Sequence, residues 1–279
     1  MTSAQPLSGQ RILVIGGAGF IGSHVVEALL ASDPKEIIIF DDFSRGRMAN
    51  LETALRDKRV KLFGESSHLL HTDVLNTAMA GIDVVFHLAA LWLLHCQDFP
   101  RAAFDVNIQG TFNVLEACVA NQVKKLVYSS SASVYGDALS TPMTEAHPFN
   151  NRTFYGATKI AGEQMCTAFH HRYGLAFAGL RYMNVYGARQ DDRGAYTNVI
   201  VKTLDRIERN QRPVIFGDGA QSYDFIYVED VARANVLAAQ SSAQNDFYNI
   251  GTGVQTSIAQ LVDTLLELTG SPPEAGLPA

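Results

Sequence analysis

Cysteine is scarce in this sequence of 279 residues, and the three cysteines lie far apart. Cys96, Cys118 and Cys166 are odd in number and lack the short spacing of zinc-binding motifs. We therefore expect no disulfide framework, and a reduced, cytoplasmic compartment fits best. The histidines are not spaced like metal ligands either, so the sequence predicts no metal site.

Positive charge and long apolar runs are also in short supply. Lys and Arg number 22 against 28 Asp and Glu, for a formal net charge of −6. No basic stripe stands out, so we expect neither nucleic acid nor an anionic membrane as a partner. The longest apolar stretch, Val84 to Leu94, is interrupted by His87 and is too short to span a bilayer. The first ten residues lack the apolar region of a secretory signal, so we expect a soluble protein.

The sequence does contain a regular alternation of short apolar runs and helical patterns, which is typical of βαβ units. Strands are predicted at Arg11–Ile15, Glu36–Phe40, Val60–Phe63, Asp83–Leu88, Lys125–Ser130 and Ala176–Arg181. Helices are predicted at Ile21–Ala31, Phe104–Asn121 and Tyr155–Tyr173. Together these elements indicate an α/β fold with a Rossmann-type doubly wound parallel sheet.

The pattern loosens after Arg181 and predicts a smaller, interleaved C-terminal lobe. Further helices are expected at Val199–Glu208 and Asp230–Gln240, and further strands at Pro213–Phe216 and Phe247–Ile250. We therefore expect residues 1–181, with 224–250 returning to them, to form the sheet domain. Residues 182–223 and 251–279 are expected to form the smaller lobe.

Glycines close the first predicted strand and open the first predicted helix. Gly16, Gly17, Gly19 and Gly22 satisfy the pattern Gly-x-Gly-x-x-Gly. Glycine is needed where a turn demands unusual dihedral angles and where the backbone must approach a pyrophosphate. The N-terminus of the following helix offers N–H groups to the phosphates. Since the motif lies between a strand and a helix, it predicts a dinucleotide site.

An acidic pair, Asp41 and Asp42, follows the second predicted strand. A carboxylate there accepts hydrogen bonds from the adenosine ribose and repels a 2′-phosphate, so NAD is favoured over NADP. Asp41 ranks first, because Asp42 fits a loop carboxylate or a helix cap equally well. Arg45, close by in the sequence, works against this preference.

Tyr155 and Lys159 stand one turn apart at the start of a predicted helix. Tyrosine is a weak acid with a pKa near 10, and a neighbouring ammonium group favours the phenolate. We therefore expect Lys159 to lower the pKa of Tyr155 toward the working range of a general base. Ser131 follows the fifth predicted strand, at the sheet edge where ligands of open α/β folds bind.

In combination these motifs resemble the nucleotide-sugar epimerase/dehydratase branch of the extended short-chain dehydrogenases, and most of all its 4-epimerase-type members. The segments that carry the resemblance occur in order along nearly the whole chain. They are Gly16-Gly-Ala-Gly-Phe-Ile-Gly22, His87-Leu-Ala-Ala90, Asn107-Ile-Gln-Gly-Thr111, the serine run that ends in Val-Tyr-Gly136, Tyr155-x-x-x-Lys159 and Arg181-Tyr-Met-Asn184-Val-Tyr-Gly187.

The resemblance implies roles for these residues. It makes Ser131, Tyr155 and Lys159 the catalytic set. The cofactor contacts it implies are Gly16, Gly19, Phe20, Ile21, Gly22, Asp41, Asp42, Ser44, Leu88, Ala89, Ala90, Asn107, Ser129, Tyr155, Lys159 and Tyr182. The substrate contacts are Ser131, Ser133, Asn184, Asn198, Phe216, Tyr223 and Arg189.

The resemblance also implies a reaction, a partner and an assembly. Tyr155 takes a proton from the sugar 4-hydroxyl while C4 passes a hydride to NAD⁺, and the hydride returns to the other face of the sugar. The partner is a nucleotide sugar, with a UDP-sugar favoured, and the assembly is a homodimer.

Several residues depart from the family pattern, and these differences bear on which reaction of the family the sequence favours. Dehydratases carry an Asp-Glu pair where this chain has Ala132 and Ser133, so a dehydratase activity is disfavoured. An arginine that grips the diphosphate is replaced by Tyr223, and either Arg189 or Arg193 can take over that grip.

Two alternatives remain beside the 4-epimerase. One is a dehydratase, reductase or other short-chain dehydrogenase with net hydride transfer, which would use the same Ser-Tyr-Lys set. The other is a non-catalytic NAD-binding protein, which the intact set disfavours.

Overall fold

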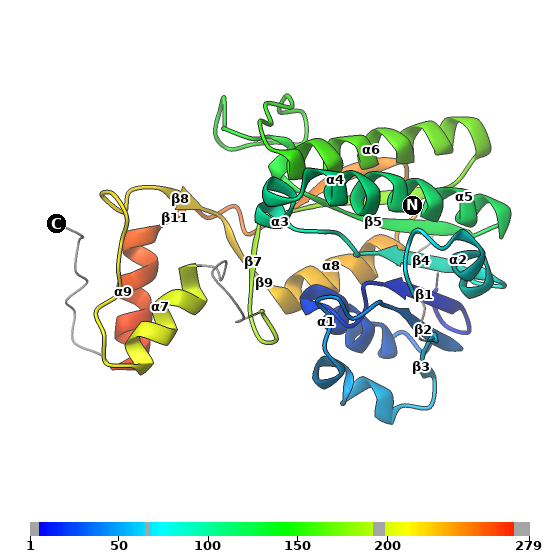
Figure 1. Ribbon diagram of the computed structural model, residues 1–279, viewed down its shortest axis with the longest axis horizontal. Coiled ribbons are helices and arrows are strands. Elements are labelled where there is room, and N and C mark those ends of the chain that lie inside the picture. Colours follow the sequence, from blue (N-terminus) through cyan, green and yellow to red (C-terminus); the bar gives the residue numbers. More distant parts are fainter. Residues whose placement is uncertain (1–5, 65–66, 192–198, 271–279) are drawn as a thin grey trace. The chain divides into compact units, whose positions relative to one another are not determined.

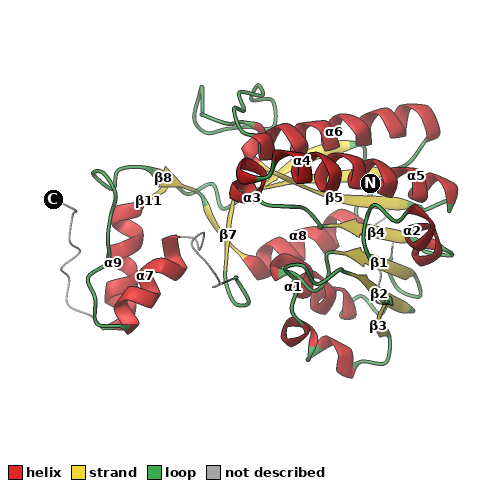
Figure 2. Ribbon diagram, in the orientation of Figure 1, coloured by secondary structure: helices red, strands yellow, loops and turns green. Residues whose placement is uncertain are grey.

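The computed structural model describes residues 6–64, 67–191 and 199–270. Its main feature is a seven-stranded parallel sheet in the order β10-β6-β5-β4-β1-β2-β3. These strands are β1 (Arg11–Ile15), β2 (Glu36–Phe40), β3 (Val60–Leu62), β4 (Val84–His87), β5 (Lys125–Ser131), β6 (Phe177–Tyr182) and β10 (Asp246–Ile250). The chain runs outward from β1 in both directions, which confirms the predicted doubly wound sheet (Figures 1 and 2).

Helices cover the sheet in two groups, and the helices within each group pack against one another. One group pairs α1 (Phe20–Leu30) with α8 (Val228–Gln240), and the other joins α2 (Thr72–Met79), α5 (Gly110–Ala120) and α6 (Phe154–Tyr173). The second group shares a core with alternate strand residues such as Leu13 and Ile15. Because both faces of the sheet are covered, its central strands are apolar without alternation.

Shorter helical segments fill the connections. They are η1 (Met48–Leu51), η2 (Ala54–Arg56), α3 (Leu93–Asp98), α4 (Pro100–Ala103), the π-helical η3 (Phe104–Gln109) and η4 (Ala132–Val134). The predicted single helix Phe104–Asn121 was therefore wrong in part, since its first six residues form wider π-helical turns. The predicted strand Pro213–Phe216 was also wrong, because these residues form no strand.

The chain divides into two compact units, Met1–Tyr182 with Val228–Ile250, and Met183–Tyr227 with Gly251–Ala279. In the second unit β7 (Asn184–Tyr186) pairs with β9 (Phe225–Tyr227), and β8 (Ser222–Tyr223) pairs with β11 (Thr256–Ser257). Its helices α7 (Val199–Glu208) and α9 (Ile258–Thr269) pack together over a small apolar core that includes Val262. A capping box between Ser257 and Gln260 starts α9.

The three cysteines are buried free thiols. Among the described residues, no helix has the length and apolarity needed to cross a membrane. In the described ranges, no group of three or more His, Cys, Asp or Glu side chains is arranged so that it could bind a metal ion.

Candidate active site

The glycine turn between β1 and α1 is shaped so that only glycine fits at two of its positions. Gly16 has φ +81°, and a Cβ there would lie 2.7 Å from the backbone nitrogen of Ala89. A Cβ on Gly22 would collide with the carbonyl oxygen of Gly16. The turn therefore brings the start of α1 close to the end of β1 and to the segment after β4.

The N-terminus of α1 is open to an anion. Gly19 is its N-cap and provides no side-chain cap, and the first turn carries no acidic residue. The first N–H groups of a helix lack intrahelical partners, and the helix dipole adds positive potential. Together with the glycine turn, this cradle fits a diphosphate such as that of NAD, with Phe20 and Ile21 in the first turn.

Asp41 lies beside this cradle. Its Oδ2 accepts the N–H of Ala18 at 2.8 Å, and its Oδ1 accepts the N–H of Phe43 at 2.9 Å. Burial raises the pKa of Asp41, and these two backbone hydrogen bonds oppose the rise. Asp42 is exposed, and its Oδ1 accepts hydrogen bonds from the N–H and the hydroxyl of Ser44. Of the acidic pair, Asp41 is the one that contacts the glycine turn.

Arg45 makes a cation–π contact in the same region. Its guanidinium carbon lies 4.8 Å from the centroid of the Trp92 ring, in the segment that follows β4. Leu88 and Ala89, at the start of that segment, both donate their N–H groups to the carbonyl oxygen of Ile15. The segment with Leu88, Ala89 and Ala90 thus lies at the end of β1.

Asn107 holds the same segment from the π-helical η3. Its Oδ1 accepts the N–H of Leu91 at 2.7 Å, and its Nδ2 donates to the carbonyl oxygen of Leu91 and to the Thr158 hydroxyl. Only 3% of Asn107 is exposed, so its amide acts within the protein. Thr158 in turn donates to the carbonyl oxygen of Tyr155, which links η3 to α6.

The three candidate catalytic residues meet at the carboxyl end of β5. Ser131 is the last residue of β5, and Tyr155 and Lys159 lie one turn apart on α6. The Ser131 side chain interacts with the Tyr155 hydroxyl and favours its ionised form. The Lys159 Nζ lies 5.7 Å from the centroid of the Tyr155 ring and donates to the carbonyl oxygen of Ser129 at 2.7 Å. Thr153 caps α6 by accepting the N–H of Gly156.

The electrostatics of this set differ from the sequence-based expectation. Burial raises the pKa of Tyr155 to about 12, and the interaction with the Ser131 side chain is the main opposing effect. Burial also lowers the pKa of Lys159 to about 8. The prediction of a lowered Tyr155 pKa was therefore wrong for the free protein, because burial of the phenol is the largest effect on this pKa.

Other predicted residues cluster around this set. The Oγ of Ser131 accepts the N–H of Ser133 and lies 3.1 Å from the Oγ of Ser133. Tyr182 is the cross-strand partner of Ser131, and its hydroxyl lies 2.9 Å from the Oγ of Ser129. The Tyr182 hydroxyl also donates to Asn235 on α8.

The remaining predicted substrate residues belong to the second compact unit. Asn184 is exposed on β7 and donates its N–H to the carbonyl oxygen of Asp224. Phe216 is 78% exposed and Tyr223 44% exposed, while Arg189 is partly buried with φ +65°. Asn198 and Arg193 lie outside the described residues.

Comparison with known proteins gives a consistent picture. Residues 12–251 match the family described as "NAD dependent epimerase/dehydratase family". A "Putative UDP-glucose 4-epimerase" of Methanocaldococcus jannaschii is 38% identical over 270 residues, which cover 95% of this chain and 84% of the relative. The UDP-glucose 4-epimerase of Mycolicibacterium smegmatis is 34% identical over 95% of this chain and 84% of its own length.

Solved structures agree in fold over almost the whole chain. The UDP-N-acetylglucosamine 4-epimerase of Methanobrevibacter ruminantium superposes with a TM-score of 0.91 at 35% identity, covering 97% of this chain and 86% of that one. The Thermus thermophilus UDP-glucose 4-epimerase in complex with NAD gives 0.83 at 32% identity, with coverages of 96% and 86%. These matches confirm the predicted resemblance. The chain belongs to the NAD-dependent epimerase/dehydratase family.

Proposed function

We propose that this protein is an NAD-dependent 4-epimerase of a nucleotide-linked sugar. The observation that carries the proposal is the meeting of Ser131, Tyr155 and Lys159 at the end of β5, in the unit that also holds the glycine cradle. In this proposal the unit with the seven-stranded sheet binds NAD, and the second unit binds the nucleotide sugar. A UDP-sugar is favoured, since the similar 4-epimerases are named for UDP-sugars.

The residues of this chain supply the acid–base part of the reaction. Tyr155, as the phenolate, accepts the proton of the sugar 4-hydroxyl and returns it when the configuration is reversed. Ser131 holds the same oxygen through its hydroxyl and shares the proton with Tyr155. The Lys159 ammonium favours the phenolate form and stays fixed by the carbonyl oxygen of Ser129. NAD, when bound, would supply the hydride acceptor and donor for C4, so that the net redox change is zero.

The turn after Ser131 favours epimerisation over dehydration. The elimination of water requires further acid–base side chains next to the sugar. The two positions that carry an Asp-Glu pair in dehydratases are Ala132 and Ser133 here, within η4. The assay is NMR of UDP-glucose, UDP-galactose and their N-acetylated counterparts with sub-stoichiometric NAD. Interconversion of C4 epimers supports the proposal, whereas loss of water or a stoichiometric absorbance change at 340 nm would favour the alternatives.

NAD is expected to raise the melting temperature more than NADP does. The partly buried Asp41 carboxylate lies against the glycine turn, where a 2′-phosphate would be repelled. The measurement is a thermal melt at equal concentrations of the two cofactors. Asp41→Asn is expected to narrow the difference, and Asp42→Asn to change it less. Equal or stronger stabilisation by NADP in the wild type would refute this cofactor assignment.

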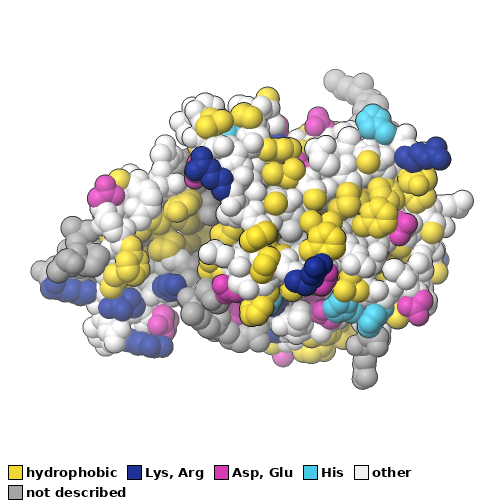
Figure 3. All heavy atoms as spheres, turned by 45° about the horizontal axis from the view of Figure 1, so that its top comes forward, with side chains coloured by type: hydrophobic (Ala, Val, Ile, Leu, Met, Phe, Trp, Pro, Cys, Tyr) yellow, Lys and Arg dark blue, Asp and Glu magenta, His cyan; other side chains and the backbone are white. Residues whose placement is uncertain are grey.

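We further propose that the protein is a homodimer, formed through α5 and α6. Aromatic side chains are exposed on these helices and on η3, namely Phe104 at 47%, Phe112 at 40% and Tyr173 at 57%. Figure 3 shows hydrophobic side chains gathered over this face. Phe112 packs edge-on against Phe169 of α6, so the exposed surface is continuous across the two helices.

Light scattering at micromolar concentration is expected to give twice the chain mass of 30.4 kDa. Phe112→Glu should shift the protein toward the monomer, because it places a charge in the apolar contact. Leu237→Glu changes a leucine on α8 that is 57% exposed, compared with 40% for Phe112, and should leave the dimer intact. A monomeric wild type would exclude this interface.

A cytoplasmic location is also proposed, and the three buried free thiols support it.

A further inference from the structure

A buried ion pair lies next to the candidate catalytic residues. Arg181 on β6 binds Glu163 on α6 through two parallel hydrogen bonds, Nε to Oε1 at 2.9 Å and Nη2 to Oε2 at 2.7 Å. The two side chains are 5% and 0% exposed. Because removing two charges from water is costly, a buried pair gains little stability over apolar side chains. Its presence here points to a role in placing its neighbours.

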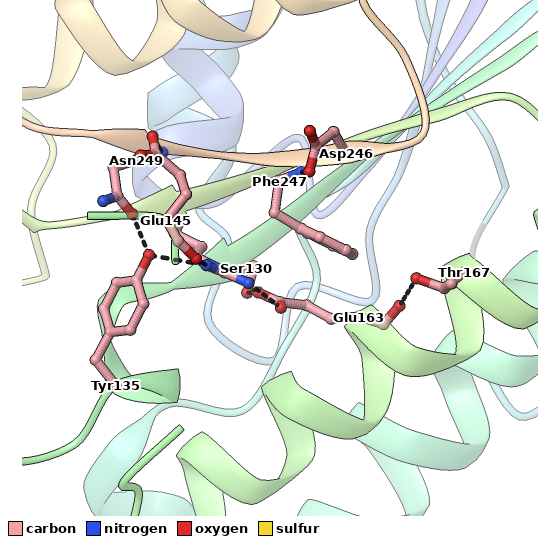
Figure 4. Close-up of polar contacts among 9 residues, drawn as sticks. Ser130, Tyr135, Glu145, Glu163, Thr167, Asp246, Phe247 and Asn249 are labelled. Carbon is pink, nitrogen blue, oxygen red and sulfur yellow. Dashed lines mark hydrogen bonds and ion pairs between the residues drawn. The ribbon is translucent and has the colours of Figure 1, made fainter. Parts of the chain in front are cut away.

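The pair holds both ends of the turn that carries Ser131. On one side, the Ser130 hydroxyl donates to Oε1 of Glu163 at 2.5 Å. On the other side, Nη1 of Arg181 donates to the Tyr135 hydroxyl at 2.8 Å. Figure 4 shows Ser130 at Glu163 and the Tyr135 hydroxyl joined by dashed lines to the same network. Residues 131–134 thus run between two anchors on one ion pair.

The network is closed by the last strand of the sheet. The Tyr135 hydroxyl donates to Oδ1 of Asn249 on β10 at 2.6 Å (Figure 4). Asn249 also donates its N–H to Oε1 of Glu145, and Arg181 donates to the carbonyl oxygen of Glu145. The Arg181 guanidinium carbon lies within 5.1–5.4 Å of the ring centroids of Tyr135, Phe149 and Phe247. Packing and hydrogen bonds together hold the Arg181 guanidinium group in place.

The same helix face carries the catalytic residues. Tyr155, Lys159 and Glu163 follow one another at intervals of one turn on α6. Each of them contacts one of three consecutive serines that end β5. Lys159 donates a hydrogen bond to the carbonyl oxygen of Ser129, and Glu163 accepts one from the hydroxyl of Ser130. Tyr155 interacts with the side chain of Ser131. Glu163 therefore fixes the register between this face and the strand.

From this arrangement we propose that Glu163 and Arg181 are positioning residues for the epimerase reaction, which hold Ser131 beside Tyr155 and keep Lys159 charged. The inference rests on the proposed function, and it adds two residues and a serine that the sequence analysis did not single out. A signal was present, because a glutamate one turn beyond Lys159 on a buried helix face needs a partner.

The electrostatic surroundings of Lys159 support the second half of this inference. Burial lowers the pKa of Lys159, and Cys96, Glu163 and Cys166 oppose that change, in this order of size. Titratable side chains face Lys159 from α3, β4, β5 and its own helix, and these are Cys96, His87, Tyr128, Tyr155, Glu163 and Cys166. Glu163 is the one carboxylate in this set. Its removal would leave the effect of burial less opposed, so the pKa of Lys159 should fall further.

The first test separates positioning from stability. Ser130→Ala removes one hydrogen bond to Glu163 and keeps both charges. We expect kcat to fall about tenfold, since small misplacement of catalytic groups is costly in rate. KM for the nucleotide sugar should change by less than about twofold. Thr167→Val is the matched control, because the Thr167 hydroxyl bonds only the backbone carbonyl of Glu163 (Figure 4). It should leave kcat unchanged.

The second test addresses charge. Glu163→Gln should move the alkaline limb of the pH profile of kcat/KM to lower pH, and Glu163→Asp should restore it in part. Independently of turnover, the ¹³Cε NMR signal of Lys159, assigned with Lys159→Met, should titrate at lower pH in Glu163→Gln than in the wild type.

The outcomes are distinguishable from failure of the proposed function. If the wild type does not interconvert C4 epimers, the function is wrong, and the NMR titration still decides the role of Glu163. A folded Glu163→Gln with an unchanged Lys159 titration would overturn the electrostatic role. A wild-type kcat in Ser130→Ala would overturn the positioning role, and that variant decides it even if Glu163→Gln does not fold.

Discussion

Replacing Tyr155 with phenylalanine is expected to lower turnover by about 10²–10⁴ while the fold stays intact. The change removes one hydroxyl and keeps the ring that packs at the start of α6. The lost hydroxyl is the one that interacts with Ser131 and that, as the phenolate, accepts the substrate proton in the proposed reaction. Because burial raises the pKa of Tyr155, the unmodified phenol also has little tendency to ionise without help.

Ser131→Ala is expected to lower turnover less than Tyr155→Phe, since it leaves the proton acceptor in place. The measurement is interconversion of C4 epimers by NMR with sub-stoichiometric NAD, together with a thermal melt of each variant. Tyr248→Phe on β10 removes a phenol hydroxyl from a residue with no proposed role in the reaction and serves as the control. Wild-type turnover in Tyr155→Phe would mean that another group moves the proton.

The sheet could be predicted from the sequence because its signals are local. β1 and β2 coincide with the predicted strands to the residue, since Arg11–Ile15 and Glu36–Phe40 are short apolar runs bounded by polar or glycine residues. The glycine turn was predictable for the same reason. The turn requires glycine because a Cβ at Gly16 or Gly22 would collide with neighbouring backbone atoms.

What the sequence did not reveal depends on contacts between distant segments. The π-helical turns of η3 have the same apolar spacing as an α-helix over six residues, so periodicity missed them. The Glu163–Arg181 pair joins a helix to a strand, and the sequence does not show that these two residues are partners. The pKa of Tyr155 depends on how completely the fold buries it, which residue spacing does not measure.

Lys159→Met is expected to reduce turnover at least as much as Ser131→Ala and yet to preserve stability at pH 7. The activity falls for two reasons. The ammonium that favours the phenolate is lost, and so is the proposed contact with NAD. In kinetics, kcat should fall, and the affinity for NAD, measured by thermal melt, should weaken. Thr167→Val, on the same helix, should show neither effect.

The stability of this variant follows from the buried charge. The pKa of Lys159 is lowered from 10.5 to about 8, so the unfolded chain binds the proton more tightly than the folded one. A shift of this size corresponds to about 3 kcal/mol of destabilisation that is fully present below pH 8. Methionine removes this penalty but leaves the carbonyl oxygen of Ser129 without its donor, which costs about 1–3 kcal/mol.

The sign of the pH dependence distinguishes this explanation from simple damage to the fold. As the pH rises from about 8 to 10.5, Lys159 loses its proton in the folded wild type and the destabilisation by the buried charge disappears. The free energy of unfolding of the wild type relative to Lys159→Met should therefore increase. Urea unfolding of both proteins at pH 7, 8.5 and 10 measures this difference directly. If the difference in free energy of unfolding between the two proteins stays constant across this pH range, Lys159 is not a buried ammonium. A gap that moves in favour of the wild type at high pH would show that the fold bears a cost at neutral pH to hold this ammonium beside Tyr155.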